Sequence, residues 1–173
     1  MSASLVSIGG HPQVVPAQKK SADKYLIFSL GSEEFGIQVL DIKEIIGLQD
    51  ITPVPRMPAY VRGVINLRGQ VIPVVDLSLK FSLKPQEHTY RTCIIVVRAR
   101  GEHGDRLIGA IADGVSDVLS ITEDAIEPRP DFGSGSETPY LMGIAKVQGK
   151  VKLLLDIHEV FHIESASPSL VTH

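Results

Sequence analysis

The sequence predicts an all-β fold built from two related halves, and three observations support this prediction. Valine and isoleucine dominate the 43% of apolar residues, aromatic residues make up 5%, and tryptophan is absent. β-Branched side chains favour strands because they pack well on a pleated surface. Short apolar runs alternate with turn-forming residues about every 8–12 residues, which is the spacing of a sandwich or a barrel. The third observation is an internal repeat.

The apolar runs predict ten strands, some of them buried on both faces. In chain order the runs are Tyr25–Leu30, Phe35–Leu40, Ile42–Leu48, Gly63–Leu67, Val71–Val75, Thr92–Ala99, Leu107–Ala112, Val115–Ile121, Gly143–Val147 and Val151–Leu155. The segment Cys93–Val97 is continuously apolar, which is typical of a strand covered on both sides. Pro73 predicts an edge position or a bulge, because proline donates no ladder hydrogen bond. Short helical turns are expected after Asp76 and Asp156.

Residues 60–81 and 140–161 form the repeat, with a constant offset of 80 residues and no gap. The identical pairs are Tyr60/Tyr140, Gly63/Gly143, Gly69/Gly149, Val71/Val151, Asp76/Asp156 and Phe81/Phe161. Each copy predicts a strand, a tight glycine turn, a second strand, and a corner at the aspartate. Glycine supplies the positive φ of such a turn, and the aspartate side chain can cap the helical turn that follows.

A weaker repeat, with an offset of 73 residues, relates Phe35-Gly36-Ile37 to Ile108-Gly109-Ala110. It also matches Ile42 with Val115 and Ile45 with Val118. The two repeats together cover most of the folded chain. Two copies of a five-stranded unit would close naturally into small barrels, which leaves no open sheet edges.

Composition and charge argue against several classes of function. The net charge of −3 lacks the concentrated basic face that nucleic-acid binding requires. No apolar run approaches the length that spans a bilayer, so membrane insertion is not expected. The N-terminus does not resemble a signal peptide, and the single cysteine, Cys93, is expected to be a small buried residue. The sequence therefore predicts a cytoplasmic protein, with flexible segments at residues 1–22, Gly133–Ser136 and 163–173.

The strongest enzymatic motif is His158-Glu159-Val160-Phe161-His162, which fits the H-E-x-x-H pattern of zinc peptidases. The alternative explanation is coincidence, with both histidines at the surface. The repeat favours coincidence, because it explains Ile157 and Phe161 as core residues and has no histidine in its other copy. Too few residues follow His162 to deliver a third ligand. We therefore expect no enzyme activity, no metal and no cofactor.

Two charged residues have a better case for function. Glu44 lies among isoleucines, and Arg68 lies at the Gly69 turn. As ordinary exposed charges they would contribute about 0–1 kcal/mol. As a partly buried pair that fixes a subdomain edge, they could specify an interface. The sequence leaves both interpretations open.

Three segments together closely resemble the CheW family of chemotaxis coupling proteins. They are FSLGSEEFGIQVLDIKEI, PAYVRGVINLRGQVIPVVDL and GAIADGVSDVLSI, and the resemblance runs from about Tyr25 to Phe161. It implies a domain over residues 23–162 made of two intertwined, five-stranded, SH3-like β-barrels. It also implies a non-catalytic adaptor, recruited to membrane-associated chemoreceptor arrays. Its partners would be the cytoplasmic tip of a methyl-accepting chemotaxis receptor and the regulatory domain of a CheA-type histidine kinase.

The resemblance also implies site residues. A receptor groove between the barrels would involve Ile37, Val39, Ile42, Glu44, Ile45, Gly63 and Arg68. In the family, the positions of Glu44 and Arg68 are implicated in receptor and kinase coupling. A kinase-facing patch would involve the second half of the chain, with Val115 and Val118 as its candidates.

Overall fold

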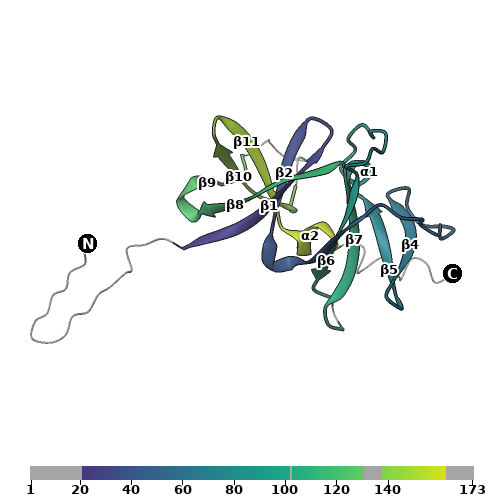
Figure 1. Ribbon diagram of the computed structural model, residues 1–173. Helices are drawn as coiled ribbons and strands as arrows, with labels where there is room; N and C mark the ends of the chain where they lie inside the picture. The colour runs from purple at the N-terminus through teal and green to yellow at the C-terminus, as the bar shows by residue number, and fades with distance from the viewer. Residues whose placement is uncertain (1–20, 102, 131–137, 163–173) are drawn as a thin grey trace, which may run out of the picture.

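Eleven strands form two curled sheets in the computed structural model, which describes residues 21–101, 103–130 and 138–162 (Figure 1). The prediction of an all-β fold with two subdomains is confirmed. The flexible segments expected at 1–22, Gly133–Ser136 and 163–173 lie outside the described residues, apart from Ser21 and Ala22. Ala22 already belongs to strand β1 (Ala22–Leu30), so the first of these segments was predicted too long at its end. Within the described residues, no helix is both long and apolar enough to cross a membrane.

The two sheets differ by one strand. The six-stranded sheet has the order β8 (Gly114–Thr122), β1 (Ala22–Leu30), β2 (Glu33–Gln38), β11 (Lys150–Leu155), β10 (Leu141–Val147), β9 (Ile126–Glu127). The five-stranded sheet has the order β3 (Ile42–Gly47), β6 (Cys93–Ala99), β7 (Arg106–Ala112), β5 (Gln70–Asp76), β4 (Val61–Leu67). The helices are α1 (Leu77–Lys80) and α2 (Ile157–Val160), with 3-10 turns η2 (Val39–Asp41) and η3 (Glu123–Ala125).

The sheets do not coincide with the sequence repeats. Strands β1 and β2 belong to the first copy but pair with β8–β11 of the second copy. Strands β6 and β7 belong to the second copy but pair with β3–β5 of the first. Two parallel pairings, of β2 with β11 and of β5 with β7, join the copies. Each sheet therefore needs strands from both halves of the chain.

Between the sheets lies a core that both share, called here the central core. Its largest fully buried members are Phe28, Leu30, Ile37, Leu77, Ile95, Ile108 and Phe161. Strand β1 contributes Leu26 to the central core and Ile27, on its other face, to the core of the six-stranded sheet. Strand β6 likewise contributes Ile95 to the central core and Ile94 to the core of the five-stranded sheet. The expected burial of Cys93–Val97 on both faces is confirmed, and burial raises the pKa of the Cys93 thiol.

The two helical corners interlock the sheets. As predicted, Asp76 accepts a hydrogen bond from Leu79 N–H and Asp156 accepts one from His158 N–H, so each aspartate caps the short helix that follows it. Phe81, which follows α1, stacks on Phe35 and on Tyr140 of the other sheet, with centroid distances of 5.9 and 4.8 Å. Residues of α2 enter the central core in turn.

Both glycine turns are two-residue hairpin loops. Arg68 and Gly69 have φ of 52° and 88°, and Gln148 and Gly149 have φ of 55° and 78°. Two successive positive φ values define the type I′ turn, which matches the twist of the flanking strands. The glycines were predicted from the sequence. The positive φ of the residue before each glycine was not predicted.

Three local predictions differ from the structure. Val39 and Leu40 lie in the η2 turn rather than in a strand. Pro73 lies on β5, which is an interior strand between β7 and β4, and no bulge occurs there. The pairing of β5 with β7 begins only at Val74, so Pro73 itself is paired on one side, with β4. Strand β9 was not predicted, since its two residues are too few to show an alternating pattern. The corresponding segment of the five-stranded sheet makes a single bridge, from Thr52 to Val64.

The repeated glycines Gly63 and Gly143 lie where these short segments pair with β4 and β10. A Cβ on Gly63 would lie 2.0 Å from the carbonyl oxygen of Thr52. A Cβ on Gly143 would lie 2.9 Å from the carbonyl oxygen of Glu127, in strand β9. Only glycine allows the short segment to approach this closely, which explains the identity at this position of the repeat.

We expect Gly63→Ala to lower the free energy of unfolding by about 2 kcal/mol or more, because the new methyl group meets backbone and φ is 143°. Gly47→Ala is the matched control, since a Cβ there has no neighbour within 4 Å. Urea unfolding of both variants measures the difference. Equal, small losses of unfolding free energy in both variants would show that the close approach of Thr52 to Gly63 is not a tight constraint.

Candidate functional site

An ion pair joins the two edges of the five-stranded sheet. Arg68, at the tip of the β4–β5 hairpin, donates from Nη2 to Oε2 of Glu44 on β3. Strands β3 and β4 are the edge strands of this sheet, so the pair links its first and last strands. The Glu44 side chain is 26% exposed and that of Arg68 is 66% exposed. The structure thus brings together the two charged residues that the sequence singled out.

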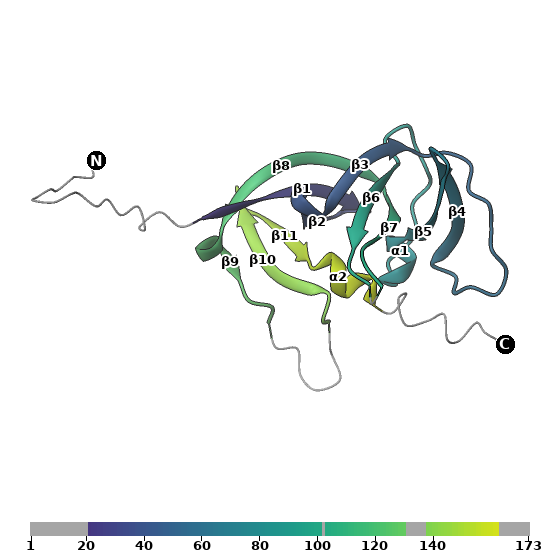
Figure 2. The same cartoon turned by 90° about the horizontal axis from the view of Figure 1, so that it is seen from below.

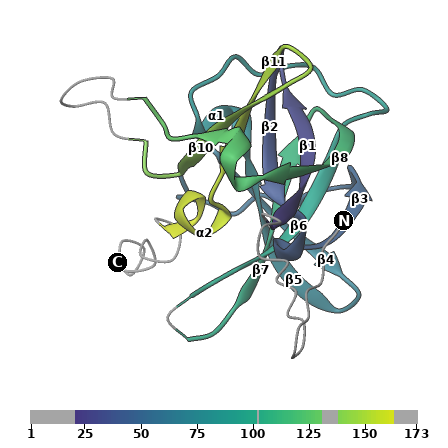
Figure 3. The same ribbon diagram turned by 90° about the vertical axis from the view of Figure 1, so that its left-hand side faces the viewer.

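The apolar candidates gather on one face, formed by β3 and β8 at the margin of the central core. Ile45 is opposite Ile95 in the ladder, and Val118 is opposite Leu26. Both ladder partners belong to the central core, and opposite residues share a face of a sheet. Strands β3 and β8 lie on the same side of the molecule in the two views that label both (Figures 2 and 3).

We call this surface the β3/β8 face and define it as Val39, Ile42, Ile45, Val115 and Val118. Val39, Ile42 and Val115 are half-buried against the central core, whereas Ile45 and Val118 are 43% and 49% exposed. Receptor and kinase candidates therefore share one face. The remaining two candidates lie inside the protein: Ile37 is a central-core residue with 1% exposure, and Gly63 is buried beneath Thr52.

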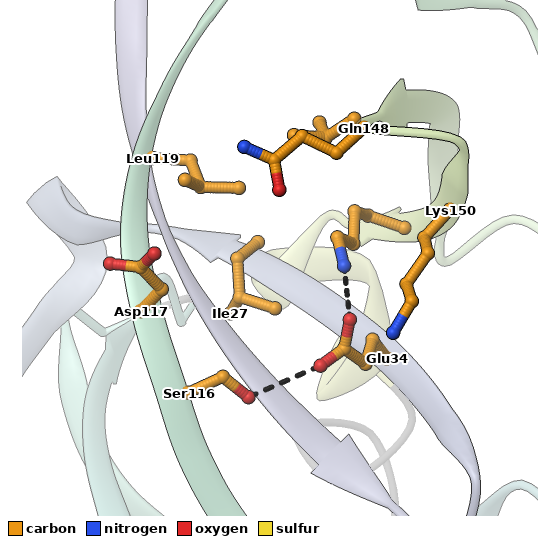
Figure 4. A pocket seen from close by; sticks show the side chains of 9 residues that line it. Ile27, Glu34, Ser116, Asp117, Leu119, Gln148 and Lys150 are labelled. Atoms are coloured by element: carbon orange, nitrogen blue, oxygen red, sulfur yellow. Dashed lines mark hydrogen bonds and ion pairs between the residues drawn. The ribbon is translucent and has the colours of Figure 1, made fainter.

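The six-stranded sheet has a different arrangement where the five-stranded sheet has its ion pair. By the repeat offsets, Asp117 is the residue equivalent to Glu44, and Gln148 is the residue equivalent to Arg68. Within the part of the chain that the structure describes, no hydrogen bond or ion pair joins Asp117 to Gln148. A pocket of about 260 Å³ lies between them, with Ile27 and Leu119 on its wall (Figure 4).

A half-buried ion pair forms one side of this pocket. Lys152, whose side chain is 9% exposed, donates to Oε1 of Glu34, and Ser116 Oγ donates to Oε2 at 3.2 Å (Figure 4). The hydrogen bond from Lys152 lowers the pKa of the Glu34 carboxyl, against a smaller opposite effect of its burial. The corresponding residues of the other sheet are the apolar Leu107 and Ile72. Sequence reasoning missed this pair, although polar residues at apolar positions of a repeat are a detectable signal.

The two histidines of the H-E-x-x-H motif have different surroundings. His162 is exposed, as expected. His158 is half-buried, contrary to its expected place at the surface, and both ring nitrogens have protein partners. Nδ1 accepts a hydrogen bond from Arg100 N–H at 3.1 Å, and Nε2 lies 3.3 Å from Asp41 Oδ1. Both ring nitrogens of His158 are therefore occupied by contacts with other residues of the protein.

The family model for the CheW-like domain matches residues 24–165, nearly all of the described fold. The chain belongs to the CheW family. It is 38% identical to the chemotaxis protein CheW of Klebsiella aerogenes over 141 residues, which cover 82% of each chain. It is 37% identical to the CheW of Rhizobium meliloti, over 80% of this chain and 87% of that protein.

A solved structure agrees with this assignment. The crystal structure of the scaffolding protein TtCheW from Thermoanaerobacter tengcongensis matches with a TM-score of 0.72 and 32% identity, over 83% of this chain and 95% of that one. Membership in the CheW family makes this chain a non-catalytic adaptor of chemotaxis signalling. Among the described residues, no cluster of three or more His, Cys, Asp or Glu side chains could hold a metal ion.

Lys152→Met should remove the ammonium of the half-buried pair and keep the aliphatic stem. At neutral pH we expect the free energy of unfolding to fall by about 1–3 kcal/mol, because the Glu34 carboxylate loses its cation. The pKa of the Glu34 carboxyl is lower in the folded protein than in the unfolded chain. The stabilisation by the ion pair is therefore complete above the pKa of the unfolded chain, and it is lost as the pH falls through the pKa of the folded protein. The difference between wild type and variant should therefore shrink below about pH 4.

The exposed Lys146 on β10, which does not line the pocket, provides the control variant, Lys146→Met. Denaturant unfolding of the three proteins between neutral and acidic pH measures both effects. A Lys152→Met protein as stable as the control, or a difference that does not change with pH, would contradict the role assigned to this pair.

Proposed function

We propose that this chain holds the cytoplasmic tip of a methyl-accepting chemotaxis receptor and the regulatory domain of a CheA-type histidine kinase together, so that receptor state controls kinase activity. The observation that carries the proposal is the divergence of equivalent surfaces in a CheW-family fold. One half of the repeat has a surface ion pair where the other has a polar pocket. Unlike surfaces on a duplicated frame suit a protein with two unlike partners.

In this proposal the β3/β8 face binds the receptor tip. Ile45 and Val118 are exposed apolar side chains on edge strands of the two sheets, and an amphipathic helix is recognised by apolar side chains arranged in this way. The Glu44–Arg68 pair lies on the opposite side of β3 from Ile45 and fixes the edge strand in place.

The kinase domain would bind the six-stranded sheet around its pocket. Asp117, Gln148 and Lys150 line this site, together with the half-buried Val147. Polar residues around a few apolar ones are typical of the rim and centre of a non-obligate interface. In this arrangement Val115 and Val118 contribute to the receptor surface rather than to the kinase surface, because they lie on the β3/β8 face.

Signalling through such an adaptor requires only differential binding. If the receptor changes the arrangement of the bound kinase by a coupling free energy of about 1–3 kcal/mol, kinase activity changes without any catalysis by the adaptor. Recruitment to membrane-associated receptor arrays follows from receptor binding. The relatives named chemotaxis protein CheW and the structure named a scaffolding protein support this role.

The direct experiment is co-sedimentation of receptor-containing membranes and purified kinase, in the presence and in the absence of this protein. The amount of kinase in the membrane pellet and its activity are measured. We expect the protein to increase kinase in the pellet and to make its activity depend on receptor state. Ile45→Glu should lower receptor affinity about tenfold or more, because it places a charge in an apolar contact. Val71→Glu, at a 65% exposed site outside the β3/β8 face, should have little effect.

Equal kinase recovery with and without the protein would contradict the proposed coupling. Equal receptor affinities for Ile45→Glu and Val71→Glu would retain the adaptor but remove the β3/β8 face as its receptor surface.

Arg68→Glu should weaken coupling while leaving the thermal unfolding midpoint little changed, because the Arg68 side chain is mostly exposed. The new carboxylate removes the ion pair and repels Glu44, which shifts the side chains at the edge strand β3, while the pairing of β3 with β6 remains. Adding Glu44→Arg to Arg68→Glu restores opposite charges and should recover part of the coupling. Receptor-dependent kinase activity and thermal unfolding are measured for both proteins. Unchanged coupling in a folded Arg68→Glu protein would remove Arg68 from the site.

A further inference from the structure

We propose that His158 is a positioning residue that latches the terminal helix of the six-stranded sheet to the segment from which β3 begins. The latch fixes the β3/β8 face in its binding-competent position. Its effect on receptor binding rests on the proposed function, whereas the latch itself concerns contacts between the two sheets and can be tested without a receptor.

One imidazole joins three segments of the chain. His158 lies on α2, directly after the six-stranded sheet ends. Nδ1 accepts from Arg100 N–H at 3.1 Å, and Arg100 directly follows β6 of the five-stranded sheet. Nε2 lies 3.3 Å from Oδ1 of Asp41, which ends the η2 turn between β2 and β3. The side chains of His158 and Asp41 are 22% and 21% exposed, so solvent competes only in part for these bonds.

The two contacts specify the tautomer of the ring. A backbone N–H can only donate, so Nδ1 of His158 must be the unprotonated nitrogen. Nε2 then carries the hydrogen and lies 3.3 Å from the Asp41 carboxylate oxygen, an electrostatic contact. The neutral imidazole thus accepts a hydrogen bond at one position and contacts a carboxylate at another on a rigid ring, which relates Arg100 to Asp41.

The first copy of the repeat has no such latch. The residue equivalent to His158 is Ser78, which is 4% exposed and too short to reach two partners. The two ends of α2 are anchored by Ile157 and Phe161, each 1% exposed in the central core. His158 therefore extends from a rigid base. The histidine that suggested a zinc site has a structural partner on each nitrogen, whereas His162 of the same motif is exposed.

The position of Asp41 connects the latch to the proposed receptor surface. Asp41 directly precedes Ile42 and strand β3, which carries Ile45. Strand β3 is an edge strand that pairs only with β6, and its ladder is interrupted between Ile42 and Glu44. The start of β3 thus depends on contacts outside the sheet. Freeing it would lower receptor affinity, because binding would then have to order this segment.

The test compares His158→Ala with His162→Ala, which changes the exposed histidine of the same motif. Hydrogen exchange of the Arg100 amide should become about tenfold faster or more in His158→Ala, and affinity for a soluble receptor-tip fragment should fall severalfold. Both should remain at wild-type values in His162→Ala. Thermal unfolding of each variant checks that it is folded.

Two conservative variants separate the two bonds. His158→Asn places an oxygen near the position of Nδ1, so it should keep slow exchange at Arg100 while losing the contact with Asp41. His158→Gln places its amide near the position of Nε2, so it should keep the contact with Asp41 and receptor affinity while Arg100 exchanges fast. A generally loosened fold would change both readouts together.

Wild-type exchange at Arg100 in folded His158→Ala would overturn the latch, whatever the receptor result. Fast exchange with unchanged receptor affinity would overturn its role in positioning the β3/β8 face. If the wild-type protein does not bind the receptor fragment at all, the proposed function fails, and the exchange data still decide on the latch.

Discussion

Both sheets depend on the central core, because β1 and β6 are buried on both faces and supply side chains to two cores each. Alternate residues of β1, such as Leu26 and Ile27, pack in opposite directions, and Ile94 and Ile95 do the same on β6. The exchange of two strands between the repeat copies reinforces this dependence. A single half of the chain would lack strands of both sheets, so the relative position of the sheets is set by the same packing that stabilises each of them.

A fixed relation between two duplicated sheets gives equivalent positions that can carry different chemistry. Near the β4–β5 hairpin, Glu44 and Arg68 form an ion pair across the five-stranded sheet, whereas a pocket separates the equivalent Asp117 and Gln148 of the six-stranded sheet. Beside this pocket, the ion pair of Glu34 and Lys152 occupies the positions that Leu107 and Ile72 have in the five-stranded sheet. The core positions of the repeat keep the frame, and the surface positions differ. This division is what an adaptor needs to present two partners in a constant geometry.

The strands, the turns and the capping aspartates could be predicted from the sequence, because each depends on local pattern: alternating apolar residues, glycine at a positive φ, and an acid before a helical turn. The strand exchange could not, because an offset shows which residues are alike but not which strands pair. Strand β9 has too few residues for a pattern. The contacts of His158 with Asp41 and Arg100 join residues far apart in the chain, so the repeat could explain its apolar neighbours but not its own role.

The central claim is that two partners occupy different surfaces of this chain at the same time. Methyl NMR of isoleucine and valine measures it directly, because Ile45 and Val118 report on the β3/β8 face and Val147 lines the pocket of the six-stranded sheet. We predict that a receptor-tip fragment shifts Ile45 and Val118, that the kinase regulatory domain shifts Val147, and that both sets stay shifted when both partners are present. Displacement of one partner by the other, or the same set of shifted methyl groups for both, would contradict the account.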